Sequence, residues 1–242
     1  MVPDATPFDV MAAGVTASAP TAMSRTPRTA AAKAKPAAGR TRRQEKAEQV
    51  RLALFDAAAR VVGKHGYAGA SVARITALAG VAQGTFYNYF ASRQDLLDQL
   101  LPAIGEEMLA HIAGQVRGER DQVAREEKRF RAFFGFLQKR PAFLRILNEA
   151  EVYAPRGFRA HLANIAAEYR RTLERAHGHG ALPGFAEDEI EPLVFLLMAA
   201  RSYTSLRYAQ GPAGRVKAPP ESLIRAYVKL MRHGLTGGSA GS

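Results

Sequence analysis

The residues between Gly66 and Arg93 combine side-chain types and a spacing that suit contact with DNA. Two short segments with helical apolar spacing meet there at Ala79-Gly80-Val81, the arrangement of a helix-turn-helix. Gly80 supplies the backbone freedom that a tight turn between helices needs. The second segment carries hydroxyl and amide groups that can donate to phosphates or address base edges. The spacing therefore predicts a motif that reads DNA.

Helical phase indicates which side chains of the second segment face outward. At about 100° per residue, Phe86 and Phe90 point inward and anchor this helix from behind. The predicted DNA contacts lie on its outer side or its flanks: Gln83, Gly84, Thr85, Tyr87, Asn88 and Tyr89. The alternative is an ordinary helical hairpin with an aromatic core, but the aromatic-rich and nearly uncharged outer face favours DNA.

This part of the chain resembles the TetR family of bacterial repressors. The resemblance rests on Arg51–Val62, Gly66-Tyr67, Ser71-Val72, Ala79-Gly80-Val81, Gly84–Phe90 and Ser92–Leu97. It implies a three-helix DNA-binding head, a linking fourth helix, a divergent helical ligand-binding body and a homodimer. It also implies a phosphate contact at Arg93, where the family commonly has Lys, and we place Ser71 among the DNA-binding residues. Ala82 stands where the family often has Ser or Thr, so the N-cap hydrogen bond of that helix is missing.

Composition agrees with a nucleic-acid partner. The chain has 242 residues, a formal net charge of +12 and no cysteine. Such a charge favours a polyanion, either nucleic acid or an acidic membrane surface, and charge alone does not choose between them. The chain contains no apolar run long enough to span a membrane and does not begin like a signal peptide, so we expect no membrane partner and a cytoplasmic location.

The N-terminal region differs in composition from the rest of the chain. Residues 1–43 are rich in Ala, Pro, Thr, Ser and basic residues, which predicts a disordered basic arm. A solvated tail is one interpretation, and an arm that adds phosphate or minor-groove contacts is the other. Arg42, Arg43 and Lys46 lie nearest the head and are its best candidates.

The remaining pattern predicts an all-α protein. We expect a helix-turn-helix DNA-binding domain over 44–92, a ligand-binding and dimerisation domain over 93–236 and a flexible tail over 237–242. A long helix from about Ser92 to Gly118 should be bent or interrupted by Pro102. Pro155-Arg156-Gly157 should separate two later helices.

The last strong helices carry broad apolar faces, around 193–206 and 223–231. Pairing with a second copy into a four-helix bundle is the interpretation that the resemblance favours. Burial within one protomer is the alternative. A two-fold dimer would let two heads read a palindrome with half-sites about one DNA turn apart.

The middle of the chain concentrates aromatic residues that could line an effector pocket. The candidates are Phe133, Phe134, Leu137, Phe143, Leu147, Glu151, His161, Ile165 and Tyr169. Aromatic residues at helical spacing are more often plain core, and a lone histidine beside them is more often structural. A further set of arginines could bind a carboxylate or phosphate, although most should be solvated: Arg140, Arg145, Arg170, Arg171, Arg201 and Arg207.

Enzymatic patterns are absent from the sequence. It has no phosphate-binding loop, no dinucleotide fingerprint and no nucleophile elbow, so we expect no catalytic residues and no cofactor. His177 and His179 lie in a Gly-rich loop without further spaced ligands, so we expect no metal.

The sequence thus predicts a regulator, most simply a repressor released from a palindromic operator by a small-molecule effector. Coupling through the fourth helix, with Pro102 and Gly105 as points of bending, is the mechanism we favour. Two alternatives stay open: a sequence-tolerant basic DNA-binding or architectural protein driven by its arm, and a ligand-binding protein with a vestigial head.

Overall fold

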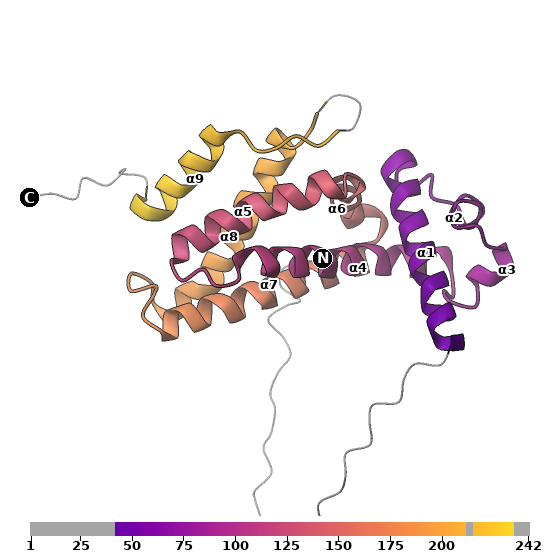
Figure 1. The fold of residues 1–242 in the computed structure, drawn as a ribbon, viewed down its shortest axis with the longest axis horizontal. Helices are drawn as coiled ribbons and strands as arrows, with labels where there is room; N and C mark the ends of the chain where they lie inside the picture. The colour runs from indigo at the N-terminus through magenta and orange to yellow at the C-terminus, as the bar shows by residue number, and fades with distance from the viewer. Residues whose placement is uncertain (1–41, 212–214, 235–242) are drawn as a thin grey trace, which may run out of the picture. The chain divides into compact units, whose positions relative to one another are not determined.

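The computed structural model describes residues 42–211 and 215–234, which form helices joined by turns and loops (Figure 1). The helices are α1 (Arg42–His65), α2 (Val72–Ala79), α3 (Gln83–Phe86), α4 (Arg93–Val116), α5 (Gln122–Lys139), α6 (Ala142–Tyr153), α7 (Pro155–Gly178), the short 3-10 helix η2 (Glu187–Glu189), α8 (Ile190–Tyr208) and α9 (Glu221–His233). In the described ranges, extended pairing is limited to an isolated bridge between Gln210 and Val216. The predicted all-α class is confirmed.

The chain divides into two compact units, residues 1–52 and residues 53–242. Of the first unit the structure describes residues 42–52, which form the first half of α1. Most of the predicted arm over 1–43 and all of the predicted tail over 237–242 lie outside the described residues. The predicted domain boundaries therefore remain predictions.

The sequence predicts some helix ends well and others poorly. Gly66 has a left-handed φ of 73° directly after α1, as expected of a glycine that stops a helix. The predicted separation of two helices is present, since α6 ends at Tyr153, but the break lies at Ala154, and Pro155-Arg156-Gly157 forms the first turn of α7. Proline is well suited to the first turn of a helix, where its missing N–H is not needed. The same residues that looked like a linker therefore start the helix.

Helix α4 occupies the centre of the second unit. It packs against α5, α6 and α7, while α8 packs on α7 and α9 packs on α5. Figure 1 shows α4, α5 and α7 running alongside one another, with α9 at the outer side of α5. The core side of α4 is fully apolar near its start, where Leu96, Leu97, Leu100 and Leu101 are buried. This helix links the residues of the predicted DNA-reading motif to the rest of the unit.

Pro102 does not interrupt α4, contrary to one form of the prediction. Proline lacks an N–H, so the carbonyl of Asp98, four residues earlier, has no intrahelical donor. Gly157 at the start of α7 lies directly against this carbonyl, since a Cβ placed there would stand 2.2 Å from the Asp98 oxygen. The Asp98 carboxylate also accepts hydrogen bonds from Arg156, at 3.0 Å from Nε and 2.8 Å from Nη2. The carbonyl freed by Pro102 thus becomes the place where α7 docks on α4.

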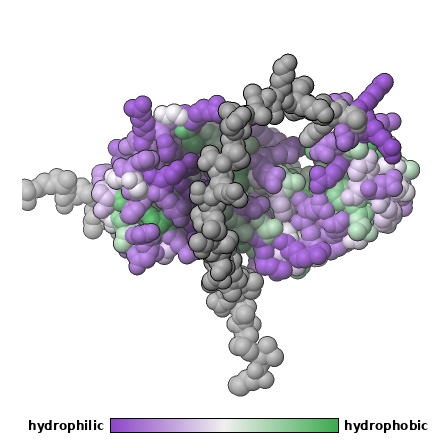
Figure 2. Space-filling model, turned by 90° about the horizontal axis from the view of Figure 1, so that it is seen from below, coloured by the Kyte–Doolittle hydropathy of each residue, from purple (hydrophilic) through white to green (hydrophobic). Residues whose placement is uncertain are grey.

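The surface is mostly hydrophilic on the face that Figure 2 shows, with small hydrophobic patches between. Part of this polar surface comes from α7, whose outer side exposes Arg159, Asn164, Arg171, Glu174 and Arg175. None of the helices in the described ranges has the length and apolarity that crossing a membrane requires.

Candidate nucleic-acid interface and effector region

The predicted turn between two helices is present at α2 and α3. Ser71 caps α2, its hydroxyl accepting a hydrogen bond from the Arg74 backbone N–H at 3.3 Å. Gly80 ends α2 in the left-handed region with φ 70°. Helix α3 then begins at Gln83 with no side-chain cap from Ala82, as the sequence predicts. Residue chemistry at the caps and the turn therefore builds this motif locally.

The predicted burial of Phe86 and Phe90 is confirmed, but the helix is shorter than predicted: α3 ends at Phe86 and residues 87–89 form a turn. Phe86 and Phe90 are buried, with ring centroids 5.5 Å apart, and Phe55 of α1 stands edge-on to Phe90 at 5.3 Å. Tyr87 is 60% exposed although it is a large aromatic residue. Gln83, Gly84 and Asn88 are also exposed, and Thr85 and Tyr89 are half-buried. The structure thus leaves all the predicted contacts of this segment at least partly exposed.

Gly84 has no packing reason to be glycine. A Cβ built at this position meets no atom within 4 Å, and Gly84 lies at an exposed position in α3. The fold would therefore accept a larger residue here. A glycine on an open face leaves room for the backbone to approach an external surface closely, which DNA reading can use.

The Arg93 side chain, at the start of α4, forms hydrogen bonds to the backbone of the loop between α1 and α2. Its Nε donates to the Ala70 carbonyl at 2.6 Å, and its Nη2 donates to the Tyr67 carbonyl. These hydrogen bonds hold the loop between α1 and α2 against the start of α4. Sequence reasoning proposed a phosphate contact at Arg93 and missed this internal role, which requires knowing that residues 67 and 70 come close. The phosphate contact itself remains a prediction.

Other basic side chains of the predicted interface are exposed. Arg42, Arg43 and Lys46 are exposed on the first turns of α1. Sequence reasoning did not single out Arg74, which is exposed on α2 and donates from Nη1 to the Gly69 carbonyl at 2.8 Å. Its position on the helix that leads into the inter-helix glycine was the available signal. Ser71 is exposed as well, and its hydroxyl is used as the cap.

The corner after α1 is held by α6. The Tyr67 backbone N–H donates to Glu149 Oε2 at 2.9 Å, and Arg145 forms an ion pair with Glu149 at 2.6 Å. Arg145 also donates to the Lys64 carbonyl at 3.2 Å. Burial raises the pKa of Glu149, and the hydrogen bonds from Arg145 and Tyr67 outweigh it, leaving this pKa below its usual value. Glu149 is therefore an ionised anchor between α6 and the loop that precedes α2.

Most predicted effector residues lie in the interior between α5, α6 and α7. Phe133, Phe134, Leu137, Phe143, His161 and Tyr169 are buried, and Leu147 and Ile165 are half-buried. Glu151 is the exception, since it is exposed near the end of α6 and is not brought together with the others. The packing among them is largely aromatic, as in the edge-on contact of Phe136 with Phe143 at 5.4 Å.

His161 of α7 lies against Gly105 of α4. A Cβ at Gly105 would stand 2.3 Å from His161 Nδ1, so this glycine makes room for the imidazole. Burial lowers the pKa of His161 to about 4, and the ring is therefore neutral at pH 7. It can serve as a hydrogen-bonding group but not as a cation.

Tyr169 meets two residues that sequence reasoning missed. Its hydroxyl donates to Glu126 Oε1 at 2.9 Å, and the Arg129 guanidinium lies 5.2 Å from its ring centroid. A signal was available, because Glu126 continues the buried stripe of Phe130, Phe133 and Leu137 by one helical turn. An ionisable residue on the apolar side of a helix indicates an internal partner.

The described residues contain no cluster of side chains that suggests a metal site. Within the described ranges, no three His, Cys, Asp or Glu side chains stand close enough together to hold a metal ion. His177 instead contacts the Phe185 carbonyl through Nε2 at 2.9 Å.

The fold and this surface define a class of protein in which a helix-turn-helix head is joined to a larger helical body. Comparison with known proteins identifies a family for part of the chain. Residues 54–100 match the family described as "Bacterial regulatory proteins, tetR family". Residues 54–100 thus carry the N-terminal segment of the TetR family, as the resemblance predicted for this part of the chain.

A curated relative and several solved structures are similar to the chain. YvdT, an uncharacterized HTH-type transcriptional regulator of Bacillus subtilis strain 168, is 42% identical over 65 residues, or 27% of this chain and 31% of the relative. The match thus spans about a third of the relative's length. A TetR-family regulator from Pectobacterium atrosepticum has a TM-score of 0.58 at 22% identity, covering 81% of this chain and 97% of that chain.

Two further structures carry names that specify a ligand or a process. The transcriptional regulator FadR of Bacillus subtilis, solved with stearoyl-CoA, has a TM-score of 0.60 at 16% identity over 76% of this chain and 98% of its own. FadR of Bacillus halodurans, a fatty acid degradation regulator, has a TM-score of 0.59 at 19% identity, with 77% and 96% covered. At these identities the likeness establishes the shared fold.

Proposed function

We propose that this protein is a cytoplasmic transcriptional repressor of the TetR family and not an enzyme. It binds a palindromic operator as a homodimer, and a small-molecule effector releases it. The observation that carries the proposal is the segment 83–90, α3 and the turn after it, where Gly84, Tyr87 and Asn88 are exposed while Phe86 and Phe90 fix the segment from behind. Exposed groups on a segment that is held from behind suit insertion into a major groove.

The outer face of α8 supports a homodimer. Leu196 is 67% exposed and Tyr203 is 79% exposed, one heptad apart on the same side of the helix, and Leu206 is 42% exposed one turn later. Leu230 of α9 is also exposed. A row of large apolar side chains in water is typical of an interface surface. A second copy would cover this row and place two α3 helices at one palindrome.

The contacts of α4 and α6 support release by an effector in the body. Helix α7 docks on the Asp98 carbonyl of α4, and Glu149 of α6 binds the backbone of Tyr67. A displacement of α6 or α7 would therefore pull on both α4 and the loop before α2. Changing the separation of two heads removes their simultaneous fit to two half-sites.

The chemistry of the effector is suggested by the aromatic interior and by the neighbouring structures. The Phe-rich space between α5, α6 and α7 suits an apolar chain, and one FadR neighbour is solved with stearoyl-CoA. Long-chain acyl-CoA is therefore the first effector to test. Its addition should lower the affinity of the protein for its operator.

Selection from a random duplex library tests the proposal most directly. The purified protein is incubated with the library at about 150 mM salt, the physiological ionic strength, and bound fragments are sequenced. Enrichment of one palindrome is the expected result. Binding without enrichment would reject the operator-reading repressor and favour the sequence-tolerant DNA-binding alternative, which the net charge of +12 would then explain.

A further inference from the structure

A cluster of buried charged and hydroxyl groups lies between α5, α7, α8 and α9. We call it the Glu126 cluster; its members are Glu126, Arg129, Tyr169, Arg201 and Tyr227. All are buried, and Phe130 closes one side, with its ring centroid 4.4 Å from that of Tyr227. Burying ionised groups is costly unless each finds a partner. The partners of each group therefore show whether the cluster is complete.

The carboxylate of Glu126 is well satisfied without Arg201. Its Oε1 accepts hydrogen bonds from the hydroxyls of Tyr169 and Tyr227, both at 2.9 Å. Its Oε2 lies 3.5 Å from Arg129 Nη1, which supplies the ion pair. Two hydroxyl donors and one guanidinium occupy most of the positions at which a carboxylate accepts.

Arg201, by contrast, has one guanidinium nitrogen without an acceptor. The residue is 6% exposed, and its Nη2 is closed off from solvent with no hydrogen-bond partner in the described ranges. The guanidinium lies over the Tyr169 ring, with Cζ 4.3 Å from the ring centroid. Arginine stays charged in proteins. A guanidinium stacked on an aromatic ring keeps its N–H groups available at its edge for a bidentate acceptor.

The charges of the cluster do not balance. Glu126 is the sole buried carboxylate in the described ranges, and two buried guanidiniums, those of Arg129 and Arg201, stand near it. The interior thus holds one positive charge more than it neutralises, at the position where Nη2 has no acceptor. Bulk solvent does not reach Nη2, because that atom is buried. An acceptor from outside the chain would complete the cluster.

We propose that Arg201 binds the anionic group, a carboxylate or a phosphate, of a small-molecule effector, while its guanidinium stays stacked on the Tyr169 ring. The proposal deepens the proposed function and rests on it for the existence of an effector. The charged end of the effector would lie at the Glu126 cluster. The apolar part of the effector would lie in the Phe-rich space between α5, α6 and α7.

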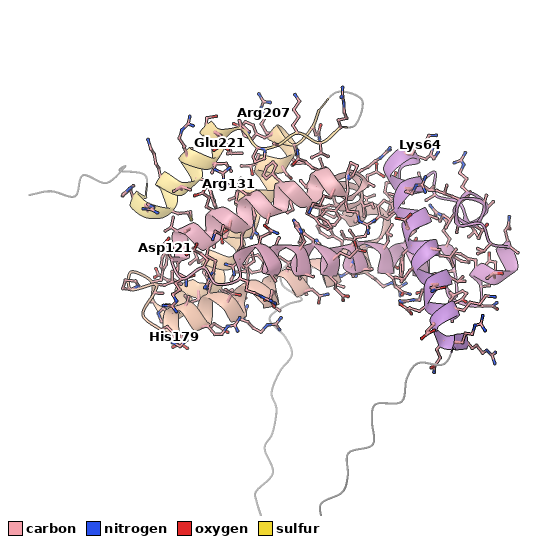
Figure 3. The ribbon with its side chains drawn as sticks, viewed as in Figure 1. Lys64, Asp121, Arg131, His179, Arg207 and Glu221 are labelled. Carbon is pink, nitrogen blue, oxygen red and sulfur yellow. The ribbon has the colours of Figure 1, made fainter. Side chains whose placement is uncertain are left out.

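Of the four helices that enclose the Glu126 cluster, α9 is the one with the fewest buried side chains. Ile224 and Tyr227 are its buried residues, whereas α5, α7 and α8 each bury more side chains. At its start Arg131 of α5 pairs with Glu221 at 2.7 Å on the surface, as Figure 3 shows. This pair is bidentate, but Glu221 is exposed, so the interaction is open to water and is screened by salt. A ligand therefore reaches Arg201 most readily by displacing α9 and the Tyr227 hydroxyl.

The experiment compares wild-type protein with Arg201→Met and with a matched control, Arg207→Met. Arg207 lies on the same helix and also stacks on a tyrosine, 5.6 Å from the Tyr208 ring centroid, but it is exposed (Figure 3). Thermal unfolding midpoints are measured without ligand and with increasing decanoate, decyl phosphate or decanol. A ligand that binds only the folded protein raises its midpoint by an amount that grows with the ratio of ligand concentration to Kd.

Decanoate or decyl phosphate should raise the midpoints of wild type and Arg207→Met but not that of Arg201→Met. The affinity should fall by about 30-fold or more, as for truncation of one partner in a buried charge pair. Decanol should act equally on all three proteins. Without ligand, Arg201→Met should unfold at or above the wild-type midpoint, because replacing a buried uncompensated charge by an apolar side chain is often neutral or stabilising.

Either of two results would overturn the proposal. The first is that neither decanoate nor decyl phosphate stabilises the wild-type protein. The second is that ligand-free Arg201→Met unfolds below wild type, which would make Arg201 a structural partner of Glu126. A parallel titration with decanoyl-CoA and with CoA alone separates a carboxylate head from the phosphates of CoA. DNA is absent throughout, so a failure of the operator proposal would leave these results unchanged.

Discussion

The head, residues 53–92, and the body, residues 93–234, treat polar groups in opposite ways. In the described head no charged side chain is buried, and the buried side-chain polar groups are the hydroxyls of Tyr67 and of Thr76, which bonds to the Val72 carbonyl of its own helix at 2.9 Å. The body instead buries Glu126, Arg129, His161 and Arg201. The head therefore keeps its reactive groups on the outside, where a large polyanion can reach them. The body keeps its reactive groups inside, where only a small molecule could meet them.

Head and body also differ in how their elements are joined. The head is held to the body by hydrogen bonds between body side chains and head backbone: Arg93 donates to the Ala70 carbonyl, and Glu149 accepts from the Tyr67 N–H. The centre of the body is joined by close backbone approach, with Gly157 against the Asp98 carbonyl. Side-chain bonds can adjust to substitution, whereas a backbone contact cannot. Substitutions in the two regions test this difference.

Gly157→Ala should reduce stability most. Its Cβ would stand 2.2 Å from the Asp98 oxygen and 2.9 Å from the Asp98 carbonyl carbon, so two helix backbones must separate. We expect the free energy of unfolding to fall by about 3 kcal/mol, the upper range for overpacking. Urea denaturation measures it. Gly114→Ala in α4 is the control, because its Cβ meets nothing within 4 Å, and it should be neutral or stabilise by about 0.5–1 kcal/mol. Equal stability of the two variants would contradict the docking of α7 on α4.

Gly84→Ala should weaken operator binding without lowering stability. The fold has open space around this Cβ, so any effect must come from what approaches α3 from outside. Contacts at base edges contribute about 1–3 kcal/mol each, and we expect affinity to fall by at least about tenfold. Fluorescence anisotropy on the selected operator measures it, and Gly114→Ala again serves as a folded control. Unchanged affinity would show that DNA does not approach this side of α3.

The head could be predicted because its signals are local. Ser71, Gly80 and the spacing of Phe86 and Phe90 each determine a cap, a turn or a phase within a few residues. The start of α7 was mispredicted because Pro155 suits both a linker and a first helical turn. The Glu126 cluster was missed because its partners come from four helices. Arg201 was named among possible ligand cations, but nothing local distinguishes its burial from the exposure of Arg207 on the same helix.

Glu149→Gln should cost about 1 kcal/mol, since it removes an ion pair and weakens the acceptor of the Tyr67 N–H. The folded pKa of Glu149 lies below its usual 4.5, so the ionised form stabilises the folded state. This contribution is complete above the unfolded value and disappears as pH falls through the folded value. Unfolding measured from neutral pH into the acid range should therefore show the difference between wild type and variant shrink with acid. A difference that persists at low pH would assign the destabilisation to packing.

Deletion of residues 1–40 should have the smallest effect and tests whether the head ends at α1. The removed segment contains Arg25, Arg28, Lys33, Lys35 and Arg40, while Arg42, Arg43 and Lys46 remain. If the arm touches phosphates, the slope of log affinity against log salt should flatten by about 0.9 for each phosphate that is no longer neutralised. Affinity for the selected operator is measured over a salt series, with the five basic residues changed to Gln in the full chain as the matched control. An unchanged slope in both proteins would make the arm a solvated tail and confine DNA binding to residues 42–92.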